Sequence, residues 1–345
     1  MSPSPVLVTG ANGFIGAHCI AALLHANHRV RATVRSSAKA TATIEALKTA
    51  AIPNLANLET AVVEDPTDVS ELAKTLPGCA SILHLASAFN YDARPGEFEE
   101  KLLHPAIAGT RAVVQAAATV PGIQRVVVMS SFASVYDASR GLQPGRVYTE
   151  KDWSPLGYEE GRDADHVATA YRASKVVAEK VAWDFVRDNT VPYTLVTLCP
   201  GMVFGKMIHP VSSIGQLNAS NQIVWGVLSA GETGEVPPTK APVWIDVEDL
   251  AHTSLRAVTL PLSSHERFLV TQGSYDTQEI ANVVRAHVPE KRDRIPLGQP
   301  GKRIADTHYA CDSSKVKSTL GVRFKALEDS VVPLARQLYA LEGGS

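Results

Sequence analysis

The chain has few cysteines, no long apolar run and no signal-peptide pattern, which are features of metal-binding, membrane and secreted proteins. Only four of its 345 residues are cysteines, and Cys19, Cys79, Cys199 and Cys311 are scattered, without the spacing of a metal site. We therefore expect no metal ion, and reduced, mostly buried thiols as in a cytoplasmic protein. No apolar run reaches the ~18 residues of a membrane span, and the first residues lack the basic and apolar segments of a signal peptide.

An excess of charge of one sign is also missing. The formal net charge is −2, which gives no electrostatic reason to expect binding to nucleic acid or to a membrane surface. Hydrophobic residues make up 45% and charged residues 20%, as in ordinary globular proteins, and the length allows one large domain or two. We expect a small-molecule partner and a monomer or homodimer.

Glycines recur at every third position directly after the first apolar run, at Gly10, Gly13 and Gly16. Gly10 permits a tight turn, Gly13 lets the backbone approach a pyrophosphate, and Gly16 lets a helix pack close to a strand. The spacing differs from the usual G-x-G-x-x-G fingerprint. A glycine-rich turn without a ligand is the alternative, but the position between a strand and a helix favours a dinucleotide site.

The predicted second strand, over 29–35, ends in basic residues. NAD-binding folds carry an acidic residue about 20 positions after the glycines, where it binds the ribose 2′-hydroxyl. Here Arg35 takes that place, and Lys39 follows. A guanidinium can bind a 2′-phosphate in bidentate fashion, so these residues favour NADP(H). The alternative is a solvated basic loop.

Apolar segments then alternate with helical ones. We predict strands over 59–64, 81–86, 125–129 and 194–198, and helices over 14–26, 41–51 and 97–119. Such alternation requires a parallel sheet with crossover helices, an α/β fold of the Rossmann type. Ligands of such sheets bind at the carboxyl ends of the strands, and this edge should bring together Gly10, Arg35, Asp65, Ser87 and Ser131.

Two residues near these strand ends leave alternatives open. Asp65 could accept a hydrogen bond from the adenine amino group or could cap the next helix. His84 lies in an apolar run, and we interpret it as a core histidine rather than a ligand.

Tyr171 and Lys175 form a Y-x-x-x-K motif in a helical run that continues to about Arg187. Residues four apart share a helix face, and an ammonium near a phenol should lower the pKa of the tyrosine. Tyr171 could then act as a general acid near neutral pH. The motif alone is weak, and an ordinary structural pair is the alternative. The upstream glycine turn and Ser130-Ser131, which ends a strand, favour the catalytic interpretation.

The alternation stops after Gly205. We predict a Rossmann domain over 1–204, to which residues 241–271 return, and a smaller C-terminal lobe that binds substrate over 205–345. Within the second half we expect strands over 243–247 and 267–271, helices over 248–258 and 277–288, a helical piece near 223–228, and a helix N-cap near Asp312.

Taken together, these motifs resemble the extended short-chain dehydrogenase/reductase family, in the branch of dihydroflavonol reductase, yeast methylglyoxal reductase and fungal carbonyl (aldehyde) reductases. The resemblance spans nearly the whole chain. The matching stretches are T-G-A-N-G-F-I-G (9–16), V-R-S-S-A-K (34–39), V-V-E-D (62–65), L-H-L-A-S (83–87), V-M-S-S (128–131), A-Y-R-A-S-K (170–175), A-E-K-V-A-W-D-F (178–185), C-P-G-M-V-F-G (199–205), W-I-D-V-E-D-L-A (244–251) and I-P-L-G-Q-P-G (295–301).

The resemblance implies a role for each motif residue. Tyr171 would protonate the carbonyl oxygen, Lys175 would bind the nicotinamide ribose and tune Tyr171, and Ser131 would donate a hydrogen bond to the substrate oxygen. The NADP(H) site would comprise Gly10, Asn12, Gly13, Phe14, Ile15, Arg35, Lys39, Asp65, Ala86, Ser87, Pro200, Gly201 and Val203. The apolar substrate wall would comprise Phe89, Phe132, Val203 and Phe204, with Met207, Ile208 and Trp225 as further candidates.

Two positions depart from the family pattern. Many members have Ala where Gly16 stands, a difference that we expect to change little. Many also have Asn where Ala108 stands, so any support that this Asn gives elsewhere must come from other residues here.

The leading hypothesis is an NADPH-dependent carbonyl reductase that acts on ketones, keto esters or aldehydes. One alternative is a hydroxysteroid-type or other NADP-dependent alcohol dehydrogenase that works in the oxidative direction. A nucleotide-sugar epimerase or dehydratase of the same superfamily is less favoured, because such proteins usually have an acid where Arg35 stands. A non-catalytic NADPH sensor is disfavoured by the presence of Ser131, Tyr171 and Lys175.

Overall fold

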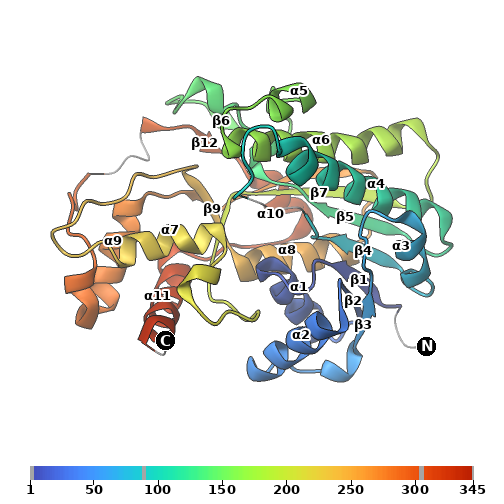
Figure 1. Ribbon diagram of the computed structural model, residues 1–345, viewed down its shortest axis with the longest axis horizontal. Helices are drawn as coiled ribbons and strands as arrows, with labels where there is room; N and C mark the ends of the chain where they lie inside the picture. The colour runs from blue at the N-terminus through green and yellow to red at the C-terminus, as the bar shows by residue number, and fades with distance from the viewer. Residues whose placement is uncertain (1–3, 88–90, 303–306, 344–345) are drawn as a thin grey trace.

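A central sheet of seven parallel strands forms the middle layer of the larger lobe (Figure 1). The computed structural model describes residues 4–87, 91–302 and 307–343. The strand order is β10-β7-β5-β4-β1-β2-β3, which confirms the predicted doubly wound α/β fold. The strands are β1 (Val6–Thr9), β2 (Val30–Val34), β3 (Leu58–Val62), β4 (Ser81–His84), β5 (Arg125–Met129), β7 (Thr194–Pro200) and β10 (Glu266–Val270).

Helices cover both faces of this sheet (Figure 1). One face carries α1 (Phe14–His25), α2 (Ser37–Thr49) and α8 (Val247–Thr259); the other carries α3 (Val69–Thr75), α4 (His104–Thr119) and α6 (Val167–Asp188). Each face therefore has its own apolar core, and strands such as β5 are buried along their whole length.

Two helices differ from the predicted boundaries. α2 begins at Ser37 rather than at residue 41, because the side chain of Ser36 accepts a hydrogen bond from the backbone N–H of Lys39 and caps the helix. The predicted helix over 97–119 is divided into a π-helical turn, Glu99–Leu103, and α4. Pro105, in the first turn of α4, has no N–H to donate, and the wider turn lies directly before it.

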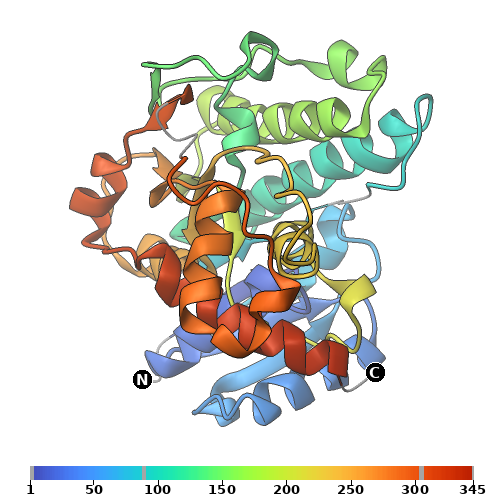
Figure 2. The ribbon, with the colours of Figure 1, turned by 90° about the vertical axis from the view of Figure 1, so that its left-hand side faces the viewer.

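A smaller lobe lies beside the carboxyl edge of the sheet (Figure 1). It contains a second sheet of β8 (Met202–Phe204), β9 (Val243–Asp246) and β11 (Gly273–Ser274), with α7 (Ala219–Leu228), α9 (Thr277–His287) and α11 (Leu327–Gly343). In Figure 2 the orange and red helices, α9 and α11, pack against each other. The main core of the larger lobe continues into this region without a break.

The remaining elements are short. They are α5 (Tyr158–Arg162), α10 (Ser314–Leu320), the paired strands β6 (Val147–Tyr148) and β12 (Ala310–Cys311), and 3-10 turns at Leu55–Asn57, Phe132–Ser134, Ala138–Arg140, Ile214–Gln216 and Pro289–Arg294. The expected N-cap region is present, since Ser313 precedes α10 and Asp312 accepts a hydrogen bond from the backbone of Ser314.

The segment 241–271 contributes to both lobes. β10 pairs with β7 in the central sheet, and α8 packs against α1. β9, in contrast, pairs with β8 and β11 in the smaller sheet. The division of the chain at residue 204 stays a prediction. Within the described residues, no helix combines the length and the apolar character of a membrane span.

Candidate active site

The glycine turn between β1 and α1 has the steric demands that its sequence suggests. Gly10 has a φ of +68°, and a Cβ there would lie 2.8 Å from the backbone N of Ala86. Gly13 is the N-cap of α1 and has no side chain to satisfy the first N–H groups of the helix. The first turn also carries no acidic residue. These features leave the positive end of α1 open to an anion such as a diphosphate.

Gly16 corrects one expectation. A Cβ at Gly16 would lie only 2.2 Å from the backbone oxygen of Gly10. Alanine at this position would therefore not be equivalent to glycine, because α1 packs too closely on the turn. The glycine is required by this close approach.

Thr9 connects the ends of the neighbouring strands β1 and β4 through hydrogen bonds, a role that was not identified from the sequence. Its Oγ1 accepts hydrogen bonds from the backbone N–H groups of Leu85 and Ala86, each over 3.1 Å. The same hydroxyl lies 2.8 Å from Nδ1 of His84. His84 is buried, as expected for a core histidine, and burial lowers its pKa to about 4, so the ring is neutral and can accept from Thr9.

The predicted phosphate-binding residues lie where β2 passes into α2. Arg35 follows β2 directly and is exposed, while Lys39 lies in the first turn of α2. Two cations and the positive end of a 13-residue helix thus share one surface. This arrangement can accommodate the 2′-phosphate of NADP(H).

Asp65 does not cap α3, and the capping alternative is wrong. The N-cap is Asp68, whose side chain accepts from the backbone N–H groups of Ser70 and Glu71. Asp65 instead accepts from the backbone and the hydroxyl of Thr67, over 2.8 and 2.6 Å. Its carboxylate remains exposed at the end of the segment after β3, and the adenine role stays a prediction.

Ser131, Tyr171 and Lys175 come together from two elements. Ser131 lies just after β5 and caps a short 3-10 turn, and its side chain is hydrogen bonded to that of Tyr171. Tyr171 and Lys175 share one face of α6, with the ammonium nitrogen 5.9 Å from the centroid of the tyrosine ring. Lys175 donates a hydrogen bond of 2.9 Å to the hydroxyl of Ser87 after β4. Two strand ends and one helix therefore build the site.

The electrostatics of the pair differ from the expectation. Burial raises the pKa of Tyr171, and the hydrogen bond with Ser131 opposes this only in part. Burial lowers the pKa of Lys175 to about 8, against the raising effect of Glu179. The prediction of a lowered pKa for Tyr171 is therefore wrong for this structure, because burial of the phenol disfavours its charged form. Tyr171 is protonated at neutral pH, as a proton donor must be.

A small cavity lies beside Lys175, between α4, α6 and the ends of β4 and β5. Its volume of ≈ 10 Å³ is about what one water molecule needs, and Ser87, Thr110, Ser130 and Glu179 give it a polar lining. Ala108 does not contribute to this lining. The residues of α4 that line the cavity are Ala106 and Thr110.

The residues expected to form the substrate wall have different surroundings. Phe204 is fully buried and packs edge-on against Tyr275, and Val203 is also buried in the main core. Phe132 is 3% exposed and stacks on Tyr136. These three side chains are core residues in this structure, because the second sheet and the neighbouring tyrosines cover them. Phe89 lies outside the described residues.

The further wall candidates also pack inward. Met207 is buried, and Trp225 on α7 packs against Tyr339 on α11. Ile208 is partly buried at the edge of the main core. Tyr91, which the sequence did not single out, is 45% exposed and has its ring 5.6 Å from that of Tyr171. Its position, not its sequence context, identifies it as a residue beside the site.

The remaining predicted cofactor residues border the glycine turn and the end of β7. Asn12 on the turn and Ile15 in the first turn of α1 are partly exposed, and Phe14 is buried against His18 and His209. Pro200 ends β7, and a Cβ at Gly201 would lie 2.7 Å from the backbone oxygen of Val243. Gly201 is thus required by the close approach of β9.

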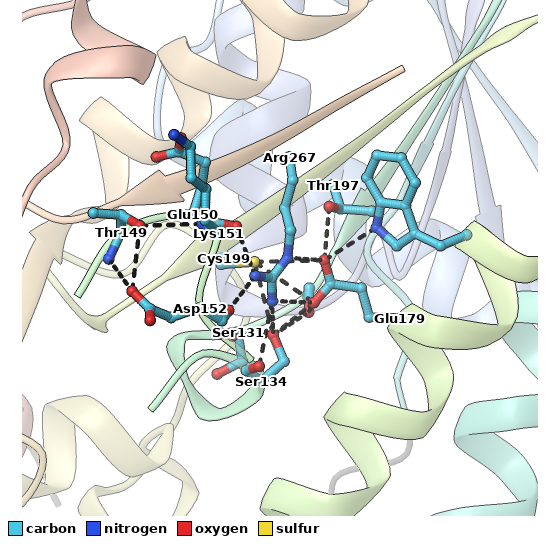
Figure 3. Close-up of polar contacts among 12 residues, drawn as sticks. Ser131, Ser134, Thr149, Glu150, Lys151, Asp152, Glu179, Thr197, Cys199 and Arg267 are labelled. Atoms are coloured by element: carbon cyan, nitrogen blue, oxygen red, sulfur yellow. Dashed lines mark hydrogen bonds and ion pairs between the residues drawn. The ribbon is translucent and has the colours of Figure 1, made fainter. Parts of the chain in front are cut away.

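The sequence did not reveal a buried ion pair that lies one helical turn beyond Lys175 on α6. Arg267 on β10 and Glu179 on α6 are joined by a bond of 2.8 Å between Nε and Oε1, and both side chains are buried (Figure 3). Glu179 belongs to a motif that the resemblance covers, but only its spacing of four from Lys175 could have suggested a role.

The described residues hold no group of three or more His, Cys, Asp or Glu side chains that could bind a metal ion. All four cysteines are free thiols, and three of them are buried, as expected.

Comparisons with known proteins agree with this geometry. A profile of the NAD dependent epimerase/dehydratase family matches residues 6–268. A putative uncharacterized oxidoreductase of Schizosaccharomyces pombe is 35% identical over 98% of both chains, and the ketoreductase azaE of Aspergillus niger is 31% identical over 94% of this chain and 95% of its own. The solved structure of yeast methylglyoxal/isovaleraldehyde reductase Gre2, complexed with NADPH, is similar with a TM-score of 0.88 and 28% identity, covering 98% of this chain and 99% of that one.

Proposed function

Because the chain belongs to the NAD dependent epimerase/dehydratase family, we propose that it is an NADPH-dependent carbonyl reductase. Its substrates are ketones, keto esters or aldehydes, which it reduces to alcohols. The observation that carries this proposal is the meeting of Ser131, Tyr171 and Lys175 at the sheet edge that also carries the glycine turn.

The residues at this edge suit a dinucleotide with a 2′-phosphate. The open end of α1 fits the diphosphate, since Gly13 offers backbone N–H groups without a side chain. Arg35 and Lys39 fit the additional phosphate of NADP(H). The relatives that are named as NADPH-dependent methylglyoxal reductases support this choice of cofactor.

NADPH held by the glycine turn, Arg35 and Lys39 would supply the hydride that reduces the carbonyl carbon. Tyr171 gives its hydroxyl proton to the carbonyl oxygen, and Ser131 donates a hydrogen bond to the same oxygen as negative charge develops there. Lys175 lies on the same helix face as Tyr171, so its ammonium stabilises the phenolate that remains after proton transfer. Solvent then returns a proton to Tyr171.

Two alternatives predict different behaviour. An alcohol dehydrogenase of the same family would use these residues in the opposite direction, with Tyr171 as the base. A nucleotide-sugar epimerase would retain NAD, but Arg35 favours a 2′-phosphate over a free ribose hydroxyl. The fold does not discriminate between these functions, since the structure of MoeE5 in complex with UDP-glucose and NAD shares it at 18% identity and a TM-score of 0.67.

The test is the loss of absorbance at 340 nm when the protein is mixed with NADPH and members of a carbonyl panel. The panel contains aliphatic and aromatic aldehydes, aryl ketones and α- and β-keto esters. Turnover with NADPH, and much slower turnover with NADH, is the expected result. Absence of turnover over the whole panel, or NAD released from the purified protein by denaturation, contradicts the proposal. Tyr171→Phe is the matched control for turnover that arises elsewhere.

A further inference from the structure

The carboxylate of Glu179 has an unusually complete set of partners for a buried group. Its oxygens accept hydrogen bonds from Ser130 and Ser134, each over 2.6 Å, and from Thr197 over 2.7 Å. Arg267 donates from Nε over 2.8 Å and from Nη2 over 3.1 Å (Figure 3). Burial alone would raise the pKa of Glu179, but the charge of Arg267 and these hydrogen bonds outweigh it and hold the pKa below its usual value.

Arg267 is itself immobilised. Its Nη1 donates to the backbone oxygens of Glu150 and Asp152, over 2.8 and 2.5 Å, and its guanidinium lies 3.7 Å from the centroid of the Trp153 ring. A planar guanidinium that has hydrogen-bond partners on three sides can keep all of these bonds in few orientations. Arg267 therefore fixes the carboxylate of Glu179 in one position.

This carboxylate is connected to Ser131 through Ser134, the last residue of the 3-10 turn that Ser131 caps. The Ser134 hydroxyl donates its one hydrogen to Glu179 Oε2 over 2.6 Å, and the backbone N–H of Ser134 donates to the backbone oxygen of Ser131 over 2.9 Å. The backbone oxygen of Ser134 accepts from the N–H of Ser154 and from Arg267. The 3-10 turn that follows Ser131 is thus attached to Glu179 on one side and to the segment around Trp153 on the other.

Glu179 is also one helical turn from Lys175 on α6. The groups that face Lys175 are Tyr171 and Glu179 on its own helix, His84 on β4 and Cys199 on β7, together with the Ser87 hydroxyl. His84 is neutral and burial raises the pKa of Cys199 to about 12, so Glu179 is the anion in this set at neutral pH.

We propose that Glu179, fixed by Arg267, is a positioning residue for carbonyl reduction that holds the turn carrying Ser131 and keeps Lys175 charged. The inference rests on the proposed function for the roles of Ser131 and Lys175. A purely structural ion pair is the competing interpretation. Buried ion pairs often add little stability compared with apolar side chains of the same size, so the charge itself needs another explanation.

The first test compares wild type with Glu179→Gln, which removes the charge but keeps the size and much of the hydrogen bonding. The pKa of Lys175 should fall by about one pH unit, because the nearest opposite charge is gone. In the pH profile of kcat, the limb in which activity is lost as pH rises should move to lower pH by the same amount. At its optimum, kcat should fall at least about tenfold, while the KM for NADPH changes little.

A second variant separates positioning from charge. Ser134→Ala keeps the ion pair but removes the hydrogen bond that attaches the turn after Ser131 to Glu179. It should lower kcat without moving the pH profile. If Glu179→Gln does not fold, the double variant Glu179→Leu/Arg267→Met removes both charges together, and it should fold, lose kcat and show the same shift of the limb.

Asp249→Asn is the matched control for a buried carboxylate. Asp249 is 9% exposed on α8 and accepts a hydrogen bond from the backbone N of Lys325, away from the catalytic residues. This variant should leave kcat and the pH limb unchanged. If Glu179→Gln loses activity while the high-pH limb of kcat and the pKa of Lys175 stay unchanged, the loss is a structural defect. That result overturns the proposal.

The titration of Lys175 by NMR, with ¹³C-lysine protein assigned through Lys175→Arg, needs no turnover. It therefore decides the effect of Glu179 even if the carbonyl panel gives no activity and the proposed function fails. An unchanged pKa of Lys175 in Glu179→Gln overturns the inference while leaving the reductase proposal intact.

Discussion

The ammonium of Lys175 donates a hydrogen bond to the hydroxyl of Ser87, 2.9 Å away and 88 positions earlier in the chain. This bond connects α6 to the segment that follows β4. The lysine side chain is buried there, and burial lowers its pKa to about 8. Lys175 should therefore lose its charge only slightly above neutral pH.

A pH dependence follows from this value. Lys175 carries a proton below about pH 8 and loses it as pH rises through that value, so the charge that assists Tyr171 disappears. The kcat/KM for carbonyl reduction should therefore be level near neutrality and fall above about pH 8. Steady-state rates between pH 6 and 10 test this, with NADPH stability monitored in parallel. Activity that rises steadily to pH 10 would contradict the role of a protonated Lys175.

Tyr171→Phe should retain NADPH binding and lose turnover. The ring still packs beside Tyr91, but the proton donor is gone. General acid catalysis typically contributes ~10²–10⁴-fold, so kcat should fall by about that factor. Stopped-flow turnover and fluorescence titration of NADPH measure the two quantities separately. A variant that keeps more than half of the wild-type kcat would contradict the assignment of Tyr171 as the proton donor.

Ser131→Ala should reduce kcat less than Tyr171→Phe does. It removes one hydrogen bond to the developing oxyanion, worth roughly 10²-fold when the donor is well placed. Ser130→Ala is the natural comparison, because the Ser130 hydroxyl points to Glu179 rather than to Tyr171. Should Ser130→Ala prove the more damaging change, the choice within the serine pair is wrong.

The sequence predicted the parts of this site that depend on local patterns. The glycine turn, the strand ends and the helix with Tyr171 and Lys175 each follow from periodicity or from short spacings, and they lie at one edge of the sheet as expected. The comparisons confirm the resemblance to the extended short-chain dehydrogenase/reductase family.

What the sequence could not predict depends on tertiary packing. Phe132 and Phe204 look like pocket residues by type, yet the segments that bury them lie far away in the chain, such as Tyr309 beside Phe132. The Glu179–Arg267 pair joins residues 88 positions apart. The direction of the Tyr171 pKa shift is set by burial, which a spacing of four residues does not reveal.

Gly16→Ala tests the packing of the glycine turn. The added methyl would lie 2.2 Å from the backbone oxygen of Gly10, so α1 or the turn must move. Such overpacking typically costs about 1–3 kcal/mol in the free energy of unfolding, and the altered turn should also weaken NADPH binding. Urea denaturation and NADPH titration measure both effects.

Gly226→Ala is the matched control for this change. Gly226 lies inside α7, and a Cβ there meets nothing within 4 Å. Alanine should raise stability by about 0.5–1 kcal/mol, because glycine is unfavourable in a helix interior. If Gly16→Ala is as stable as wild type and binds NADPH equally well, the correction drawn from the close approach to Gly10 fails.

The last prediction concerns the choice of cofactor. Arg35 is exposed at the end of β2, beside the N-terminus of α2, where its guanidinium can pair with two oxygens of a 2′-phosphate. A charge-assisted hydrogen bond contributes roughly 1.5–3 kcal/mol, and 1.4 kcal/mol is tenfold in affinity, so its loss should raise the KM for NADPH by about one to two orders of magnitude. NADH has a hydroxyl at this position and has no such contact to lose.

Arg35→Asp should do more than remove the contact, because the new carboxylate repels the phosphate and can accept a hydrogen bond from the ribose hydroxyl of NADH. The measurement is kcat/KM for NADPH and NADH in wild type, in Arg35→Asp and in Arg323→Asp. The last variant makes the same change of charge at an exposed arginine between α10 and α11 and should keep the wild-type preference. Wild type should prefer NADPH, and Arg35→Asp should lose or reverse that preference. An unchanged ratio in Arg35→Asp would mean that Arg35 faces solvent and that other residues recognise the phosphate.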